Sequence, residues 1–213
     1  MFKGKKKILL LCVIGILFLL AMGALFVKEK KSSEEKAAAK AAVEARLATW
    51  KSSGGEAFAE QYILGGVTVS DDMKAKYTQA CNEMLELMKY EVVYVTKNQE
   101  GEYLVKVGYQ SADIYQKFLG AIDAHAEKFL KDAKKEDYKV KKEKKIAAQI
   151  QENYLTEVCQ LLKDACNAVS YSENVNTTMD FVVKADKNGE FQVDESQIGQ
   201  FEVKILKIDE IQD

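Results

Sequence analysis

The sequence has no proline, and histidine occurs only once among its 213 residues. Because a proline ring breaks the hydrogen bonds inside a helix, its absence is consistent with long uninterrupted helices. A Ser–His or Cys–His catalytic pair would have to use the one histidine, His125. His125 lies three residues after Ile122 and four before Phe129, at the edge of an apolar helical stripe, so we interpret it as a structural residue.

The motifs that usually mark an enzyme are also missing. The chain contains no Gly-x-Ser-x-Gly elbow, no His-Glu-x-x-His zinc motif, no Gly-x-x-x-x-Gly-Lys phosphate loop and no Gly-x-Gly-x-x-Gly turn. Hydrolases, zinc enzymes, nucleotide enzymes and dinucleotide enzymes therefore lack their sequence signatures here. We expect no cofactor and no catalytic residues.

Residues 186–195 superficially match a calcium-binding loop, because Asp186 and Asn188 are two residues apart. In such a loop the glycine is sixth and the bidentate glutamate is twelfth. Here Gly189 is fourth and Glu195 is tenth. We therefore interpret the stretch as a hairpin turn, in which Asn-Gly tolerates the left-handed backbone, and we expect no metal site.

Cysteine is sparse, and its spacing is uninformative. Three cysteines lie outside the long apolar run, namely Cys81, Cys159 and Cys166, and none forms a Cys-x-x-Cys pair. Cys159 and Cys166 are seven residues apart on one predicted helix, about 10 Å along its axis and beyond disulfide reach. All three fall beside apolar stripes, so we interpret them as buried free thiols.

The sequence does have one long apolar run, residues 8–27, with twenty residues and no charge. A bilayer core of about 30 Å needs about 20 helical residues, so the run predicts a transmembrane signal anchor. A cleavable signal peptide is the alternative, because Ala21, Gly23 and Ala24 match a cleavage site. Residues 25–27 continue the apolar run past that site, which favours the uncleaved anchor. Lipid attachment at Cys12 is not expected, because fifteen apolar residues follow it.

Lysines on both sides of the run bear on its orientation. Four precede it, Lys3, Lys5, Lys6 and Lys7, and three follow it, Lys28, Lys30 and Lys31. A short basic amino terminus rarely crosses a membrane, whereas a large domain readily does. We predict residues 1–7 in the cytoplasm, a linker over 28–32 and one extracytoplasmic domain over 33–213, or a secreted domain after cleavage.

The predicted domain is acidic. Residues 32–213 carry 24 basic and 32 acidic side chains, a net charge of −8. Nucleic-acid binding depends on neutralising phosphates, so no nucleic-acid partner is expected. About 180 residues suit one domain with a real core.

Hydrophobic periodicity predicts an α+β domain. Period-two alternation marks a hairpin with strands near 91–97 and 102–110, and the same pattern predicts strands near 176–186, 190–194 and 200–208. Apolar residues at helical spacing predict helices near 33–51, 56–63 and 143–169, and others starting near residues 71 and 113. We expect these helices to pack on a curved, mostly antiparallel sheet of four or five strands.

Two groups of residues are candidates for a binding site. In the second hairpin strand, Tyr103 and Tyr109 share one face, which should meet the core or a pocket. We take these two residues, and Phe181 from the predicted strand over 176–186, as candidate pocket walls. The second group lies between residues 128 and 145, where nine lysines stand against four acidic residues. An anionic surface would attract such a cluster, and its candidate residues are Lys134, Lys135, Lys141 and Lys142. A solvated connection between two helices is the plainer interpretation.

The order of these elements resembles the small membrane-anchored envelope proteins of Gram-positive bacteria that carry an NTF2-like or cystatin-like domain of unknown function. The resemblance covers roughly residues 33–208 and includes the stretches VTVSDDMKAKY, EGEYLVKVGYQSADI and VNTTMDFVVKADKNGEFQVDE. It implies a curved sheet wrapped on helices, often around a cavity, in a binding or assembly module. No catalytic residue carries over, and the lipid-attachment cysteine common in such proteins is missing from its usual place.

The sequence thus predicts a non-enzymatic, membrane-anchored extracytoplasmic domain that binds an envelope protein or a small ligand. The membrane itself is the partner of residues 8–27, and the oligomeric state stays open. Two alternatives remain at this point. The chain is an accessory subunit of a membrane or cell-envelope complex, or it is an enzyme with an unrecognised pocket site.

Overall fold

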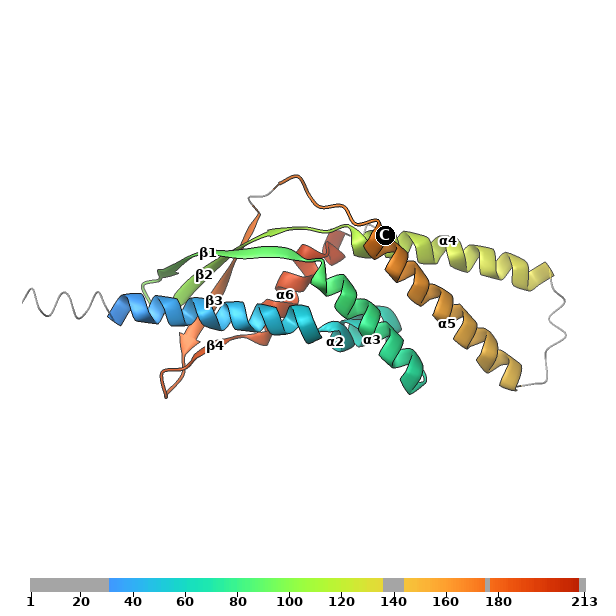
Figure 1. Ribbon diagram of the computed structural model, residues 1–213, viewed down its shortest axis with the longest axis horizontal. Helices are drawn as coiled ribbons and strands as arrows, with labels where there is room; N and C mark the ends of the chain where they lie inside the picture. The colour runs from blue at the N-terminus through green and yellow to red at the C-terminus, as the bar shows by residue number, and fades with distance from the viewer. Residues whose placement is uncertain (1–30, 136–143, 175–176, 211–213) are drawn as a thin grey trace, which may run out of the picture.

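The computed structural model describes residues 31–135, 144–174 and 177–210 and has an α+β fold (Figure 1). Its sheet has four strands in the order β1-β2-β3-β4, and every neighbouring pair is antiparallel. The strands are β1 (Lys89–Lys97), β2 (Tyr103–Gln110), β3 (Thr178–Ala185) and β4 (Phe191–Val193). The predicted class, helices packed on an antiparallel sheet, is confirmed.

The helices fall into two groups. A helix over residues 31–53 and α6 (Glu195–Ile205) cover one face of the sheet, and η2 (Ile208–Glu210) is a short 3-10 helix after α6. The helices α3 (Asp71–Glu86), α4 (Ile114–Lys135) and α5 (Lys144–Asn167) form the other group, together with α2 (Gly55–Phe58) and the π-helix η1 (Ala59–Leu64). Figure 1 shows α4 and α5 extending to the end of the molecule opposite the start of the first helix.

Helix α3 illustrates how local sequence sets these elements. Ser70 is its N-cap, and the Ser70 hydroxyl accepts a hydrogen bond from the Met73 N–H at 3.3 Å. Asp71 and Asp72 in the first turn face the positive end of the helix dipole. The predicted apolar stripe is buried, with Tyr77 fully so, and the Tyr77 hydroxyl donates to the Leu155 carbonyl of α5 at 2.7 Å.

The predicted hairpin is confirmed as β1 and β2. Asn98 holds its turn, because its side-chain oxygen accepts from the N–H groups of Glu100 at 3.0 Å and Glu102 at 2.9 Å. Gly101 follows with φ +85°, a conformation that glycine adopts readily. The register shifts between Val92 and Tyr94, which marks a β-bulge in β1.

The strand predicted over 200–208 is wrong, because this segment belongs to helix α6. Phe201, Val203 and Ile205 alternate with charged residues and so mimic the period of a strand. The helix starts because Asp194 is its N-cap and accepts from the Ser196 N–H at 2.8 Å. Its buried residues are spaced by three, one and three positions, as one face of a helix requires, and they are Ile198, Phe201, Glu202 and Ile205.

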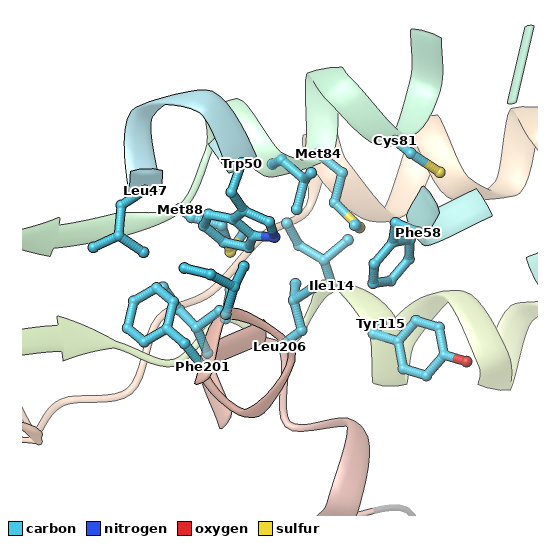
Figure 2. Close-up of a cluster of buried hydrophobic side chains, with 14 of the residues drawn as sticks. Leu47, Trp50, Phe58, Cys81, Met84, Met88, Ile114, Tyr115, Phe201 and Leu206 are labelled. Carbon is cyan, nitrogen blue, oxygen red and sulfur yellow. The ribbon is translucent and has the colours of Figure 1, made fainter. Parts of the chain in front are cut away.

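The hydrophobic core lies between the sheet and the helices of both groups, and Figure 2 shows some of its side chains. The first helix and α6 meet at Trp50 and Phe201, whose ring centroids are 5.6 Å apart. The indole N–H of Trp50 also donates to a Glu202 carboxylate oxygen at 2.8 Å. Closer to the start of α6, Arg46 forms an ion pair with Glu195. The first helix is therefore fixed to α6 by both apolar and polar contacts.

The predicted anchor, residues 8–27, lies outside the described residues. Within the ranges that the structure describes, no helix combines the length and the apolar character needed to cross a membrane. Residues 31 and 32, which the sequence assigned to a linker over 28–32, are already helical.

Candidate functional site

The three candidate pocket residues lie in the core. Tyr103, Tyr109 and Phe181 are 3%, 6% and 0% exposed. Phe201 of α6 packs on two of them, with ring centroids 5.4 Å from Tyr109 and 5.6 Å from Phe181. Tyr103 packs on Phe191 at 5.3 Å. The rings of these residues therefore fill the space over this face of the sheet. The cover comes from α6, where the sequence had predicted a strand over 200–208.

Tyr103 also makes a polar contact with the first helix. Its hydroxyl donates to the Glu35 carboxylate, and the Lys97 ammonium donates to the same hydroxyl at 2.9 Å. This hydrogen bond from Tyr103 lowers the pKa of Glu35, while burial raises the pKa of Tyr103. The contact ties the start of the first helix to the hairpin.

The candidate lysine cluster is described only in part. Lys134 and Lys135 are the last two residues of α4, whereas Lys141 and Lys142 lie outside the described residues. The end of α4 is far from the start of the first helix (Figure 1). Attraction of this cluster to an anionic surface stays a prediction.

His125 lies between α4 and α5. Its Nε2 is 2.9 Å from a Glu157 carboxylate oxygen, and its ring stacks on Tyr154 with centroids 5.4 Å apart. With a side chain only 18% exposed, it bridges the two helices, as a structural histidine would.

The cysteines are free and largely buried. Cys81 and Cys159 are buried, and Cys166 is half-buried. Burial raises the pKa of all three thiols, to about 11 for Cys166, so they stay protonated at neutral pH. Among the described residues, no three His, Cys, Asp or Glu side chains come together as metal ligands.

A different part of the sheet presents an open hollow. Its volume is about 830 Å³, and it lies along β3, β4 and the first turns of α6. We call it the β3 hollow. It is lined by Asp180, Val182 and Lys184 of β3 and by Gln197 and Gln200 of α6.

The hollow exists because β4 is short. Asp186 closes the turn before β4, since its carboxylate accepts from the N–H groups of Asn188 at 2.8 Å and Glu190 at 2.9 Å. Only three residues of β4 then pair with β3, opposite Val183, Lys184 and Ala185. Asp194 begins α6 immediately afterwards, so the first half of β3 has no strand on that side.

Gln197 takes the place of a strand beside Val182. Its side-chain oxygen accepts from the Val182 N–H at 2.7 Å, and its side-chain amide donates to the Val182 carbonyl at 3.0 Å. A side-chain amide has the same donor and acceptor as a peptide group. The two bonds therefore reproduce what a neighbouring β-strand would supply at this one position.

Two residues of β3 have no such substitute. Backbone groups of successive residues in a strand point to opposite edges, so residues two positions apart point to the same edge, and the backbone groups of Val182 point to the hollow. The backbone groups of Asp180 and Thr178 must therefore point to the same edge of β3 as those of Val182, which agrees with the Tyr109 N–H donating to the carbonyl of Thr177 on the other edge at 3.0 Å. Both residues are exposed. No described residue hydrogen-bonds to their backbone groups on the hollow side.

The β3 hollow is acidic. Four carboxylates line it, those of Glu102, Asp180, Asp186 and Asp194, together with the ammonium of Lys184, and a second ammonium, that of Lys106, lies 3.7 Å from the Asp180 carboxylate. Glu102 pairs with Lys184 at 2.7 Å, and this contact lowers the pKa of Glu102. The hydrogen bond from Ser196 likewise lowers the pKa of Asp194. These two carboxylates therefore stay ionised at neutral pH.

The opposite edge of the sheet is less suited to a further strand. β1 is also an edge strand, but its bulge between Val92 and Tyr94 interrupts the regular spacing of backbone groups. Val93 and Tyr94 are about half exposed there, and the Lys106 ammonium lies 5.2 Å from the Tyr94 ring centre. The regular, open stretch of strand edge is therefore at β3.

Sequence reasoning placed β3 and β4 but missed this site. One signal was available, since the predicted strand over 176–186 was twice as long as the one over 190–194 and had to leave part of its edge unpaired. Gln197 carried no signal, because the segment after residue 194 was not recognised as a helix start.

No protein-family model, no curated protein and no solved structure matches the chain.

Proposed function

We propose that the chain is an extracytoplasmic protein-interaction domain that residues 8–27 hold at a membrane. The observation that carries the proposal is the open edge of β3, where no described residue bonds the outward backbone groups of Thr178 and Asp180, and where Asp180 lines a hollow of about 830 Å³. Exposed strand edges are a recurring means by which domains bind extended segments of other proteins. A binding site of this kind needs neither a catalytic group nor a cofactor.

A macromolecular partner fits the structure better than a small ligand. The helix-covered face of the sheet is filled by Phe201 and the rings around it, with Phe201 fully buried. The β3 hollow, in contrast, is open along its length and is lined by backbone groups and carboxylates. Small-molecule sites are usually concave and mostly apolar, whereas an extended chain matches a polar groove beside a strand.

The first helix supports the membrane-held part of the proposal. It is described over residues 31–53, starting four residues after the apolar run, and this stretch is about 35 Å long at 1.5 Å per residue. Arg46 and Trp50 fix it to α6, the helix that also provides Gln197. The helix nearest in sequence to residues 8–27 is thus fixed to α6, which forms one wall of the β3 hollow.

We also propose that the chain belongs with the membrane-anchored envelope proteins that carry an NTF2-like or cystatin-like domain. An antiparallel sheet with helices on one face is compatible with that group. The accessory-subunit alternative is a special case of it, in which the bound protein is a stable member of the same complex.

The test combines topology with photo-crosslinking in intact cells. A chain with a C-terminal tag carries a photo-crosslinking amino acid in place of Gln200, which is exposed and lines the hollow. The matched control carries it in place of Thr156, which is exposed on α5, a helix that lies away from β3 and β4 (Figure 1).

We expect external protease to remove the tag while a membrane fragment that contains Met1 remains. We also expect a discrete protein adduct from position 200 and none of that mass from position 156. A tag that is protected until the cells are lysed would refute the extracytoplasmic domain. Equal adducts from both positions would refute the β3 hollow as the interaction site.

A further inference from the structure

We propose that the occupant of the β3 hollow is an extended, basic peptide segment of another protein, which adds to the free edge of β3 as a further strand. This inference rests on the proposed function and names the partner's chemistry. Three observations support it: the backbone pattern of β3, the behaviour of Gln197 and the charge of the walls.

The backbone pattern fits a strand of a few residues. Thr178 and Asp180 are two positions apart, about 6.6 Å along the strand, and each offers one N–H and one carbonyl at the free edge of β3, next to the hollow that Asp180 lines. A peptide that lies beside them can form up to about four ladder hydrogen bonds. Gln197 shows that the same edge accepts an amide partner, because it already bonds both backbone groups of Val182 at 2.7 and 3.0 Å.

The charge of the walls selects the partner. With four carboxylates against the ammonium groups of Lys184 and of Lys106, which pairs with Asp180, the hollow keeps an excess of negative charge, so it attracts a positively charged segment and repels an acidic one. A second copy of this chain that paired through its own β3 edge would bring two acidic walls together, and like charges on paired strands are unfavourable. The charges therefore favour a basic segment of a different protein.

Side-chain alternation refines the segment. Residues of an added strand alternate between the two faces of the sheet. On one face they would lie beside Asp180, and on the other beside the half-buried Met179 and beside Gln200 of α6. A segment in which basic and apolar residues alternate satisfies both faces.

The probe is a fluorescent heptapeptide, KVKVKVK, with both ends blocked. Its binding to the 213-residue chain in a neutral detergent is followed by fluorescence anisotropy. Two control peptides accompany it. EVEVEVE keeps the strand pattern and reverses the charge, whereas KVKPKVK keeps the charge and places a proline, which has no N–H, at the centre. We expect KVKVKVK to bind, added salt to weaken it, and both controls to bind at least about fivefold more weakly.

Variants of the chain test the same contacts from the other side. Asp180→Asn removes the charge and keeps the N–H, whereas Asp180→Pro removes both, and proline is tolerated at the outer side of an edge strand. We expect Asp180→Pro to bind about fivefold more weakly than Asp180→Asn, the effect of one lost hydrogen bond. Gln197→Ala frees the backbone groups of Val182, so we expect it to bind the peptide more tightly than the unmodified chain.

The outcomes separate the alternatives. Equal binding of KVKVKVK and KVKPKVK would overturn strand addition, even if Asp180→Pro failed to fold. Equal binding of EVEVEVE would overturn the basic partner, and weaker binding by Gln197→Ala would assign the contact to the glutamine side chain instead. Concentration-dependent self-association that Asp180→Pro abolishes would make a second copy the occupant. An adduct from position 200 without peptide binding would refute this inference alone, whereas a protected tag would refute the proposed function alone.

Discussion

Phe201 is the side chain that most directly tests the helix α6 and the filled face of the sheet. It is 0% exposed, and its ring lies between 5.4 and 5.8 Å from the rings of four neighbours, Trp50, Tyr90, Tyr109 and Phe181. Truncating a buried phenylalanine to alanine costs about 3–5 kcal/mol. Because the whole free energy of unfolding is about 5–15 kcal/mol for a typical domain, Phe201→Ala should remove a large fraction of it.

The assay is urea unfolding followed by the fluorescence of Trp50, the one tryptophan of the chain. The matched control is Val203→Ala, two residues further along α6, where Val203 is only half-buried. It should cost about 1 kcal/mol, since only part of its apolar surface is removed from water. In a strand, Phe201 and Val203 would lie on the same face. A loss of about 3 kcal/mol or more from Val203→Ala would therefore refute the helical packing.

Three further predictions concern the buried polar groups. Trp50→Phe removes the hydrogen bond to Glu202 and should lower the free energy of unfolding by about 1.5–3 kcal/mol; a double-mutant cycle with Glu202→Gln, measured in urea by circular dichroism because the Trp50→Phe variants lack the tryptophan, should show that the two positions are coupled. Burial raises the pKa of Glu202, so the folded state binds its proton more tightly than the unfolded state, and stability must fall as the pH rises from 4.5 through the raised pKa. Urea unfolding at about pH 4 and about pH 8 should therefore show Glu202→Gln gaining stability over the unmodified chain at the higher pH, and an equal difference at both would contradict a buried carboxylate. Finally, the half-buried Cys166 should react with iodoacetamide faster than Cys81, whose pKa burial raises further; equal rates by mass spectrometry would show that Cys81 is accessible in the folded protein.

Much of the fold could be read from local patterns. The helix after Ser70 and the β1–β2 hairpin were predicted because their signals, an N-cap with acidic residues behind it and a period-two alternation around Asn98, act over a few residues. The segment after Asp194 was misread because its alternation of apolar and charged residues satisfies a strand as well as one side of a helix. The N-cap at Asp194 was the local signal that would have decided between them.

The candidate site depended on long-range pairing. Strand alternation predicts that Tyr103 and Tyr109 lie on one face of β2, and the pairing of Val105 with Phe181 puts Phe181 on the same face of the sheet. Whether that face opens on a pocket depends on what covers it, and the cover is Phe201, which is 20 residues later in the chain than Phe181. No local rule predicts such a contact.

The sequence by itself determined the class of the fold, the acidic charge of residues 32–213, the apolar run over 8–27 and the positions of most elements. These properties follow from composition and from periodicities of a few residues. Only the tertiary structure decided which strand edge is left open, because that depends on where β4 ends against β3 and on which side chain of α6 reaches Val182. Strand pairing and helix packing join residues that are distant in sequence, and this pairing leaves the outward backbone groups of Thr178 and Asp180 without a partner among the described residues.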